Sequence, residues 1–203
     1  MTPLPPHGSL RRRSVLRALG VAASRLMLPG IAVAGWAASG VARAAEAALT
    51  AFEVVRDEDG LTLTYAVEFE LGKAVDEALT KSVPLFFVAE AEIFRDRWYW
   101  RDRRIVEAQR VFKVVLQPLT STYRVTTIGG LSQSYASRAE AIASISRASR
   151  WKVAEPGQLE EGGRHYVEFQ YRLDTTQLPR PMQIGISGEP DWQLSVKRTL
   201  RIN

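Results

Sequence analysis

Apolar residues occupy every second position from Leu61 to Phe69, and this alternation constrains the fold more than any other feature of the chain. Side chains of a β-strand point to opposite faces in turn, so the pattern is typical of a strand with one buried face. A second run with the same period extends from His165 to Leu173. The two runs predict antiparallel strands that cover one hydrophobic core.

Five further segments have the composition of strands, and two have features of helices. The stretch from Leu85 to Arg97 is apolar on both faces in its first half, which predicts a central strand. Ser137 and Glu140 match a capping box, so we expect a helix to begin there, and a second short helix is expected at residues 76–82. The other expected strands are residues 49–56, 105–116, 121–128 and 192–202. Asp57-Glu58-Asp59-Gly60 is expected to join 49–56 to the strand that begins at Leu61 as a hairpin. Leu178–Pro181 is expected to be an extended connection, because neither Pro179 nor Pro181 can donate a ladder hydrogen bond. About seven strands with one or two short helices predict a mainly β fold, an antiparallel β-sandwich.

The charge of the chain is unevenly distributed. Residues 1–44 contain six of the 27 Lys and Arg residues and no Asp or Glu, so 21 basic and 22 acidic residues remain in the body. The formal net charge of +5 therefore belongs to the N-terminal segment. The body lacks the excess of positive charge that nucleic-acid-binding proteins carry, and we expect no nucleic acid as a partner.

The first 44 residues have the organisation of a signal peptide. An Arg-rich start is followed by the seventeen uncharged residues 26–42 and then by Ala42-Arg43-Ala44, a small-x-small site, which predicts cleavage between Ala44 and Ala45. The sequence Arg12 to Arg17 resembles the twin-arginine export pattern, so general secretion and twin-arginine export both remain open. An uncleaved anchor formed by residues 26–42 is the alternative.

The predicted export signal places the body outside the cytoplasm. Basic residues before an apolar segment stay on the cytoplasmic side, so residues 45–203 are expected in the periplasm, soluble after cleavage or anchored by residues 26–42. A body of this length fits a single mature β-rich domain. The chain contains no cysteine, which excludes disulfides, thiolate catalysis and Cys-ligated metals.

The sequence predicts no cofactor and no metal site. The body has a single histidine, His165, which is in phase with the buried face of its strand. We interpret it as a core residue whose ring is hydrogen-bonded by a backbone group, because a zinc site needs three or four ligands. Gly129-Gly130 and Gly162-Gly163 have the features of turns rather than of phosphate-binding loops.

An aromatic and arginine-rich segment is the candidate binding surface. Three aromatic residues stand between two Arg-Asp-Arg sequences, and Trp, Tyr and Arg are the residue types enriched in interface hot spots. A protein contact, a membrane or glycan contact, and a hairpin end whose Arg and Asp pair across strands are the three interpretations. The candidate interface residues are Arg97, Trp98, Tyr99, Trp100, Arg101, Arg103 and Arg104.

A pair of carboxylates offers the alternative chemistry. Glu90 and Glu92 lie two positions apart and share one face of the expected strand. Two such groups can act as general acid and base, with Asp96 or Asp102 nearby, or they can hold a hard cation. Alternating Glu residues on a strand are also typical of a solvated face, and no catalytic residue is assigned.

Four segments of the body occur in a characteristic order: Arg97–Asp102, Leu119–Val125, Leu173–Gln183 and Asp191-Trp192. Together they resemble a family of exported proteobacterial proteins known as domain of unknown function 4390, and the resemblance covers essentially the whole mature chain. It implies a secreted or membrane-attached protein, without an activity, cofactor or catalytic residue to carry over. Genes of the family often lie beside that of a membrane sensor kinase of the nitrogen-regulation type, which is compatible with a periplasmic accessory role.

The sequence thus predicts a non-enzymatic extracytoplasmic domain that contacts an envelope or membrane protein, such as a sensor kinase. The alternative is an envelope hydrolase that depends on carboxylates.

Overall fold

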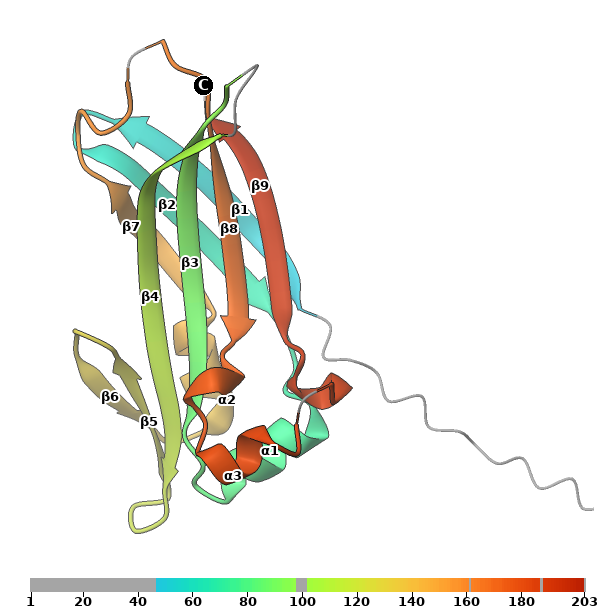
Figure 1. The fold of residues 1–203 in the computed structure, drawn as a ribbon. Coiled ribbons are helices and arrows are strands. Elements are labelled where there is room, and N and C mark those ends of the chain that lie inside the picture. Colours follow the sequence, from blue (N-terminus) through green and yellow to red (C-terminus); the bar gives the residue numbers. More distant parts are fainter. Residues whose placement is uncertain (1–46, 98–101, 161, 187, 203) are drawn as a thin grey trace, which may run out of the picture. The chain divides into compact units, whose positions relative to one another are not determined.

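Two antiparallel sheets make up most of the protein (Figure 1). The computed structural model describes residues 47–97, 102–160, 162–186 and 188–202. One sheet has the order β1-β2-β7, with β1 (Ala48–Asp57), β2 (Gly60–Glu68) and β7 (Arg147–Ala154). The other has the order β6-β5-β4-β3-β8-β9, with β3 (Leu85–Arg95), β4 (Arg103–Gln117), β5 (Thr122–Thr127), β6 (Ser132–Tyr135), β8 (His165–Leu173) and β9 (Ser195–Ile202). The predicted mainly β fold is confirmed.

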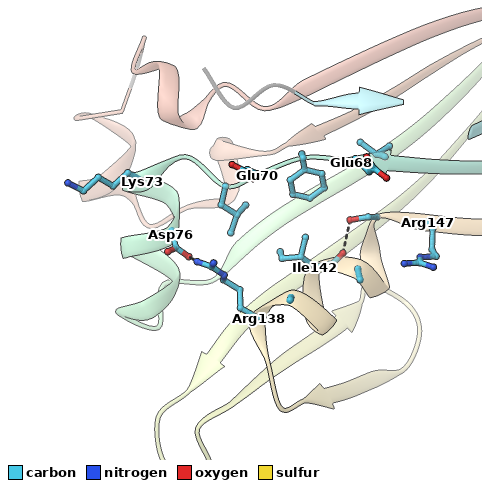
Figure 2. A pocket seen from close by; sticks show the side chains of 13 residues that line it. Glu68, Glu70, Lys73, Asp76, Arg138, Ile142 and Arg147 are labelled. Atoms are coloured by element: carbon cyan, nitrogen blue, oxygen red, sulfur yellow. Dashed lines mark hydrogen bonds and ion pairs between the residues drawn. The ribbon is translucent and has the colours of Figure 1, made fainter. Parts of the chain in front are cut away.

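Two of the three described α-helices lie close together at one end of the sheets. Helix α1 (Lys73–Thr80) begins three residues before the predicted helix, and the carboxylate of Asp191 accepts a hydrogen bond from the Ala74 N–H at its first turn. Helix α2 (Arg138–Ile145) begins with the predicted capping box, in which Ser137 and Glu140 each accept from the other's backbone N–H. An ion pair between Asp76 and Arg138 joins α1 to α2 (Figure 2).

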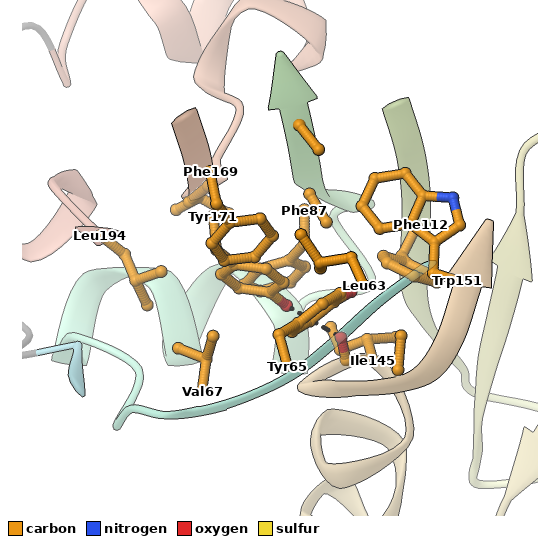
Figure 3. Close-up of a cluster of buried hydrophobic side chains, with 14 of the residues drawn as sticks. Leu63, Tyr65, Val67, Phe87, Phe112, Ile145, Trp151, Phe169, Tyr171 and Leu194 are labelled. Atoms are coloured by element: carbon orange, nitrogen blue, oxygen red, sulfur yellow. Dashed lines mark hydrogen bonds between the residues drawn. The ribbon is translucent and has the colours of Figure 1, made fainter. Parts of the chain in front are cut away.

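The alternating residues of β2 and β8 meet between the two sheets, as the period of two predicts. The Tyr65 ring of β2 lies 4.9 Å from the Phe169 ring and 6.2 Å from the Tyr171 ring of β8. Figure 3 shows these rings packed with Phe87 of β3 in one cluster. Strand β3 lies between β4 and β8, so the predicted central position is correct. This packing buries the inner faces of both sheets, which form the hydrophobic core of the protein.

Tight turns set the register of the strands. Strands β1 and β2 form the hairpin that the sequence predicts, with Asp57 opposite Gly60. The Asp57 carboxylate accepts a hydrogen bond from the Asp59 N–H. Gly60 has a φ of 116°, and a Cβ at this position would collide with the Ala154 carbonyl oxygen of β7. Glycine is therefore required both for the backbone conformation and for the close approach of β7.

The segment after β8 differs from the expected extended connection. It forms a 3₁₀ turn, η1 (Thr175–Gln177), then the short helix α3 (Arg180–Gln183) and a second 3₁₀ turn, η2 (Pro190–Trp192). The prediction of an extended chain through Pro179 and Pro181 was wrong. Proline is tolerated in the first helical turn, because its missing N–H would have no intrahelical partner there.

Two strands escaped the sequence analysis. Strand β7 carries charged residues at Arg147, Arg150 and Lys152, and Arg150 has a φ of 49° near a register shift against β2. These features hide the alternation that buries Trp151 and Val153. Strand β6 is four polar residues long, and only its pairing with β5 makes it a strand.

We predict that the hydroxyl group of Tyr65 costs stability. The side chain is buried, and its oxygen has no hydrogen-bond partner among the described residues. Because an unpaired buried hydroxyl is unfavourable, Tyr65→Phe should leave the free energy of unfolding in urea unchanged or raise it by about 1 kcal/mol. The contrasting variant Phe169→Ala should lower it by about 3–5 kcal/mol, since it opens a cavity in the same cluster. A loss above about 1 kcal/mol for Tyr65→Phe would mean that the hydroxyl has a partner.

Candidate functional site

The candidate interface lies at the hairpin that joins β3 to β4. Arg97, Arg103 and Arg104 are described and exposed. Trp98, Tyr99, Trp100 and Arg101 lie outside the described residues, as do Ala44 and Ala45 of the predicted cleavage site. The structure thus describes both flanks of the aromatic segment, which we call the hairpin base: residues 94–97, residues 102–104 and Tyr166.

Asp102 holds the hairpin base together. One carboxylate oxygen accepts the backbone N–H of Arg97 at 3.0 Å, and the other accepts the hydroxyl of Tyr166 at 2.8 Å. The Arg97 N–H and then the Tyr166 hydroxyl lower the pKa of Asp102, because both stabilise the ionised carboxylate. A single aspartate therefore links the two flanks of the segment to each other and to β8.

Tyr166 attaches this arrangement to the sheet. Its ring stacks on the Phe94 ring with a centroid distance of 5.3 Å and an angle of 15° between the planes. Burial, together with the hydrogen bond to Asp102, raises the pKa of Tyr166 to about 12. The hydroxyl remains a donor throughout the physiological pH range, as its bond to a carboxylate requires.

Ion pairs form at the hairpin base. One interpretation of the segment predicts pairs between Arg and Asp across the two strands of the hairpin. The Arg95 guanidinium lies 2.6 Å from the Glu160 carboxylate, and Arg164 lies 3.7 Å from Asp96. The Asp96 N–H also donates to the Arg164 carbonyl. These pairs join β3 to the loop between β7 and β8, rather than linking Arg and Asp across the β3–β4 hairpin itself.

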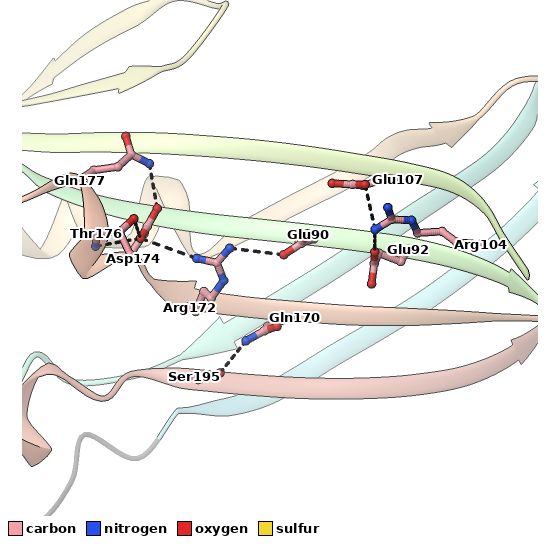
Figure 4. Close-up of polar contacts among 10 residues, drawn as sticks. All are labelled: Glu90, Glu92, Arg104, Glu107, Gln170, Arg172, Asp174, Thr176, Gln177 and Ser195. Atoms are coloured by element: carbon pink, nitrogen blue, oxygen red, sulfur yellow. Dashed lines mark hydrogen bonds and ion pairs between the residues drawn. The ribbon is translucent and has the colours of Figure 1, made fainter. Parts of the chain in front are cut away.

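Arg104 has a different role from the other candidate residues. Its guanidinium binds Glu92 and lies 3.0 Å from Glu107 on the outer face of the six-stranded sheet (Figure 4). Its hydrogen bond to Glu92 raises the pKa of Arg104. The positive charge of Arg104 therefore neutralises carboxylates of its own sheet.

Glu90 and Glu92 share one strand face, as the sequence predicts. Each lies beside an arginine, since Glu92 binds Arg104 and Glu90 lies 3.5 Å from Arg172 (Figure 4). Neither is a lining residue of the cavity beside α2, the cavity beside η1, the one at the β1–β2 turn or the one beneath β5. For the described residues, this geometry supplies charge balance on an open sheet face.

His165 occupies the buried position that its phase predicts, with only 2% of the residue exposed. Neither ring nitrogen has a hydrogen-bond partner of regular geometry among the described residues, although the Gly163 backbone interacts with the ring. Burial lowers the pKa of His165, and the nearby Arg56 and Arg95 guanidinium groups also lower it. The Gly163 backbone and Glu160 act in the opposite direction without outweighing burial.

The sequence analysis did not find a groove of about 660 Å³ between the β2–α1 connection and α2. Figure 2 shows its two walls, with Glu68 and Glu70 on one and Arg147 on the other. The walls are about 70 residues apart in the chain. No spacing rule links such distant segments, so only the folded chain shows that they form one surface.

The family comparison agrees with the four quoted segments. A family model described as Domain of unknown function (DUF4390) matches residues 44–202. The chain belongs to this family. Comparison with curated proteins and with solved structures finds no match. Within the part of this family member that the structure describes, no helix has the length and hydrophobicity needed to span a membrane.

We predict that Asp102→Ala loosens the hairpin base without unfolding the domain. The pKa of Tyr166 should fall from about 12 toward its ordinary value of 10 without reaching it, since burial remains. The Arg97 amide should exchange faster with deuterium. NMR titration of ¹³C-labelled tyrosine measures the first effect, with Asp59→Ala, at an exposed position of the β1–β2 turn, as the matched control. The Asp102 contribution should be present above pH 3.8 and lost as the pH falls through its lowered pKa. An unchanged Tyr166 titration would contradict the proposed hydrogen bond.

We also predict that His165 makes folding pH-dependent. Its pKa in the folded state lies below the ordinary value of 6.5, so the unfolded chain binds a proton more readily. The free energy of unfolding should therefore be highest above pH 6.5 and decrease as the pH falls below it. Urea unfolding at several pH values should show a smaller decrease for His165→Leu. Equal slopes for both proteins between pH 7 and 5 would assign the dependence to other groups.

Proposed function

We propose that this protein is a non-enzymatic binding domain of the cell envelope. In this proposal, the β3–β4 hairpin contacts another envelope or membrane protein. The observation that carries the proposal is the hairpin base, in which Asp102 joins the Arg97 backbone to the Tyr166 hydroxyl. This base holds both ends of the segment 98–101 at defined positions on the sheet.

A held segment is well suited to binding. Ordering a free loop on association costs conformational entropy, and fixing its ends in advance reduces that cost. The segment between the two flanks has the sequence Trp98-Tyr99-Trp100-Arg101. Aromatic and arginine side chains contribute most of the energy in many interfaces, because they bury large areas and keep a polar group. Arg97 and Arg103 add exposed positive charge beside it.

The N-terminal segment supports an envelope location. We infer that residues 1–44 direct export, by general secretion or the twin-arginine route, and that residues 45–203 act in the periplasm. A retained segment 26–42 would instead anchor the same domain to the membrane. A membrane sensor kinase is a suitable partner, because its extracytoplasmic part would lie in the same compartment.

The hydrolase alternative has weaker support. The carboxylates it needs, Glu90 and Glu92, lie beside arginines on an open sheet face. Catalytic carboxylates usually lie in a pocket that positions a substrate and excludes water.

We predict that the aromatic segment is needed to capture the partner. Crosslinking in intact cells, followed by mass spectrometry, should join the native protein to one membrane or envelope protein. The double variant Trp98→Ala/Trp100→Ala should reduce this capture at least tenfold at an unchanged melting temperature. Ile128→Ala/Leu131→Ala is the matched control, because it removes two exposed apolar side chains, 56% and 82% exposed, from the β5–β6 turn.

Two further measurements make this experiment decisive. Cell fractionation should find the protein outside the cytoplasm, and an intact mass should show whether the chain begins at Ala45. Equal capture by the aromatic variant and the control would overturn the proposed surface. A protein confined to the cytoplasm would overturn the proposed location.

A further inference from the structure

The groove beside α2 exists because the pairing of β2 and β7 stops early. Ala66 pairs with Arg147, and the Val67 N–H then donates to the Ser146 carbonyl at 2.8 Å. Beyond this bond the chain that would extend β7 forms α2 instead. The β2–α1 connection, residues 69–72, therefore continues past the end of β2 with a groove on the side where β7 would lie.

Small side chains on α2 leave the groove open. Ala139, Ile142 and Ala143 line the helical wall. The methyl groups of the two alanines are too short to reach the opposite wall. At one end the ion pair between Asp76 and Arg138 bridges the two walls (Figure 2). The volume of about 660 Å³ is in the range of cavities that hold ligands.

The apolar part of the groove lining is supported by the core. The Phe69 ring lies 5.6 Å from the Phe87 ring and 5.7 Å from the Tyr171 ring, and is half-buried. Contacts with core residues restrict the motion of this ring. Together with Ile142 it offers a fixed apolar surface inside the groove.

The two walls differ in charge. Glu68, at the end of β2, and Glu70 are exposed on one wall, which also carries Lys73 at the start of α1, whereas Arg147 is exposed on the other wall at the start of β7. A ligand in the part of the groove beside Glu68 and Glu70 therefore meets carboxylates on one side and a guanidinium on the other. This arrangement is complementary to a chain with basic groups on one edge, an acidic group on the other and apolar groups between them.

We propose that this groove binds a short extended peptide segment of a partner protein. Its backbone pairs with the β2–α1 connection at residues 69–71, as an added strand in place of the missing extension of β7. One apolar side chain packs on Phe69 and Ile142, and basic side chains face Glu68 and Glu70. An extended strand needs only about 4.8 Å beside its neighbour, whereas a helix is at least about 10 Å wide. The Val67 N–H already approaches the Ser146 carbonyl as one strand approaches another where the groove begins, which favours the strand. This site is separate from the hairpin, and the inference does not depend on the proposed function.

A random-peptide display library screened against the full-length protein purified from cells tests the proposal. The recovered peptides are synthesised, and their Kd is measured for the native protein and two tryptophan variants. Ala143→Trp fills the groove and should weaken binding at least tenfold. Ala136→Trp, at an exposed alanine just before α2, should leave binding unchanged. Hydrogen exchange of the amides of residues 69–71 should slow when peptide is bound, because a new strand would protect them.

A charge reversal keeps the test decisive if Ala143→Trp lowers the melting temperature. Glu68→Lys/Glu70→Lys should weaken the same peptides at least tenfold, whereas Glu53→Lys/Glu58→Lys, at exposed positions of β1 and its turn, should not. The proposal is overturned if the library yields no binder, or if both groove variants bind like the native protein. It is also overturned if lysophosphatidylethanolamine protects the amides of residues 69–71 and the peptides do not. Each of these results leaves the test of the hairpin unaffected.

Discussion

The packing of the inner face of β2 on β3 and β8 is the interaction on which the rest of the structure depends. The ring of Tyr65 lies at its centre, 4.9 Å from the Phe169 ring and 6.2 Å from the Tyr171 ring. Burial of apolar area supplies the main driving force for folding, at about 25 cal/mol per Å². In a chain without cysteine no disulfide assists this core. The hairpin base and the groove both occupy edges of this packed structure, so each derives its rigidity from the same contacts.

The unequal width of the two sheets explains where a binding surface can form. Three strands cannot cover a six-stranded sheet, and α2 packs against β5, β6 and β7 where the smaller sheet ends. A helix follows the edge of a strand less closely than another strand would, which leaves the groove. At the opposite end of β3, Asp102 joins the two flanks of the hairpin to each other and to β8 through hydrogen bonds with Arg97 and Tyr166. Both candidate surfaces are thus consequences of how the sandwich ends (Figure 1).

Local patterns predicted those elements whose cause is local. The alternation in β2 and β8, the turn at Asp57–Gly60 and the capping box at Ser137 were all confirmed. The same approach failed where a distant contact decides the structure. Strand β6 is a strand only because it pairs with β5, and α1 begins earlier than expected where Asp191, far along the chain, bonds the Ala74 N–H. His165 was correctly placed in the core, but the surroundings of its ring depend on the Gly163 backbone in the loop before β8.

The sequence by itself determined the mainly β class, the buried face of each alternating strand and the shared face of Glu90 and Glu92. Family membership was also recognisable from short segments of the chain. Only the tertiary structure decided the strand order, the partners of the carboxylates and the groove between Glu68 and Arg147. The reason is physical: the alternation of side chains is a property of neighbouring residues, whereas strand pairing and surface hollows arise between segments far apart in the chain. The candidate binding surfaces of this protein depend mostly on contacts between segments far apart in the chain.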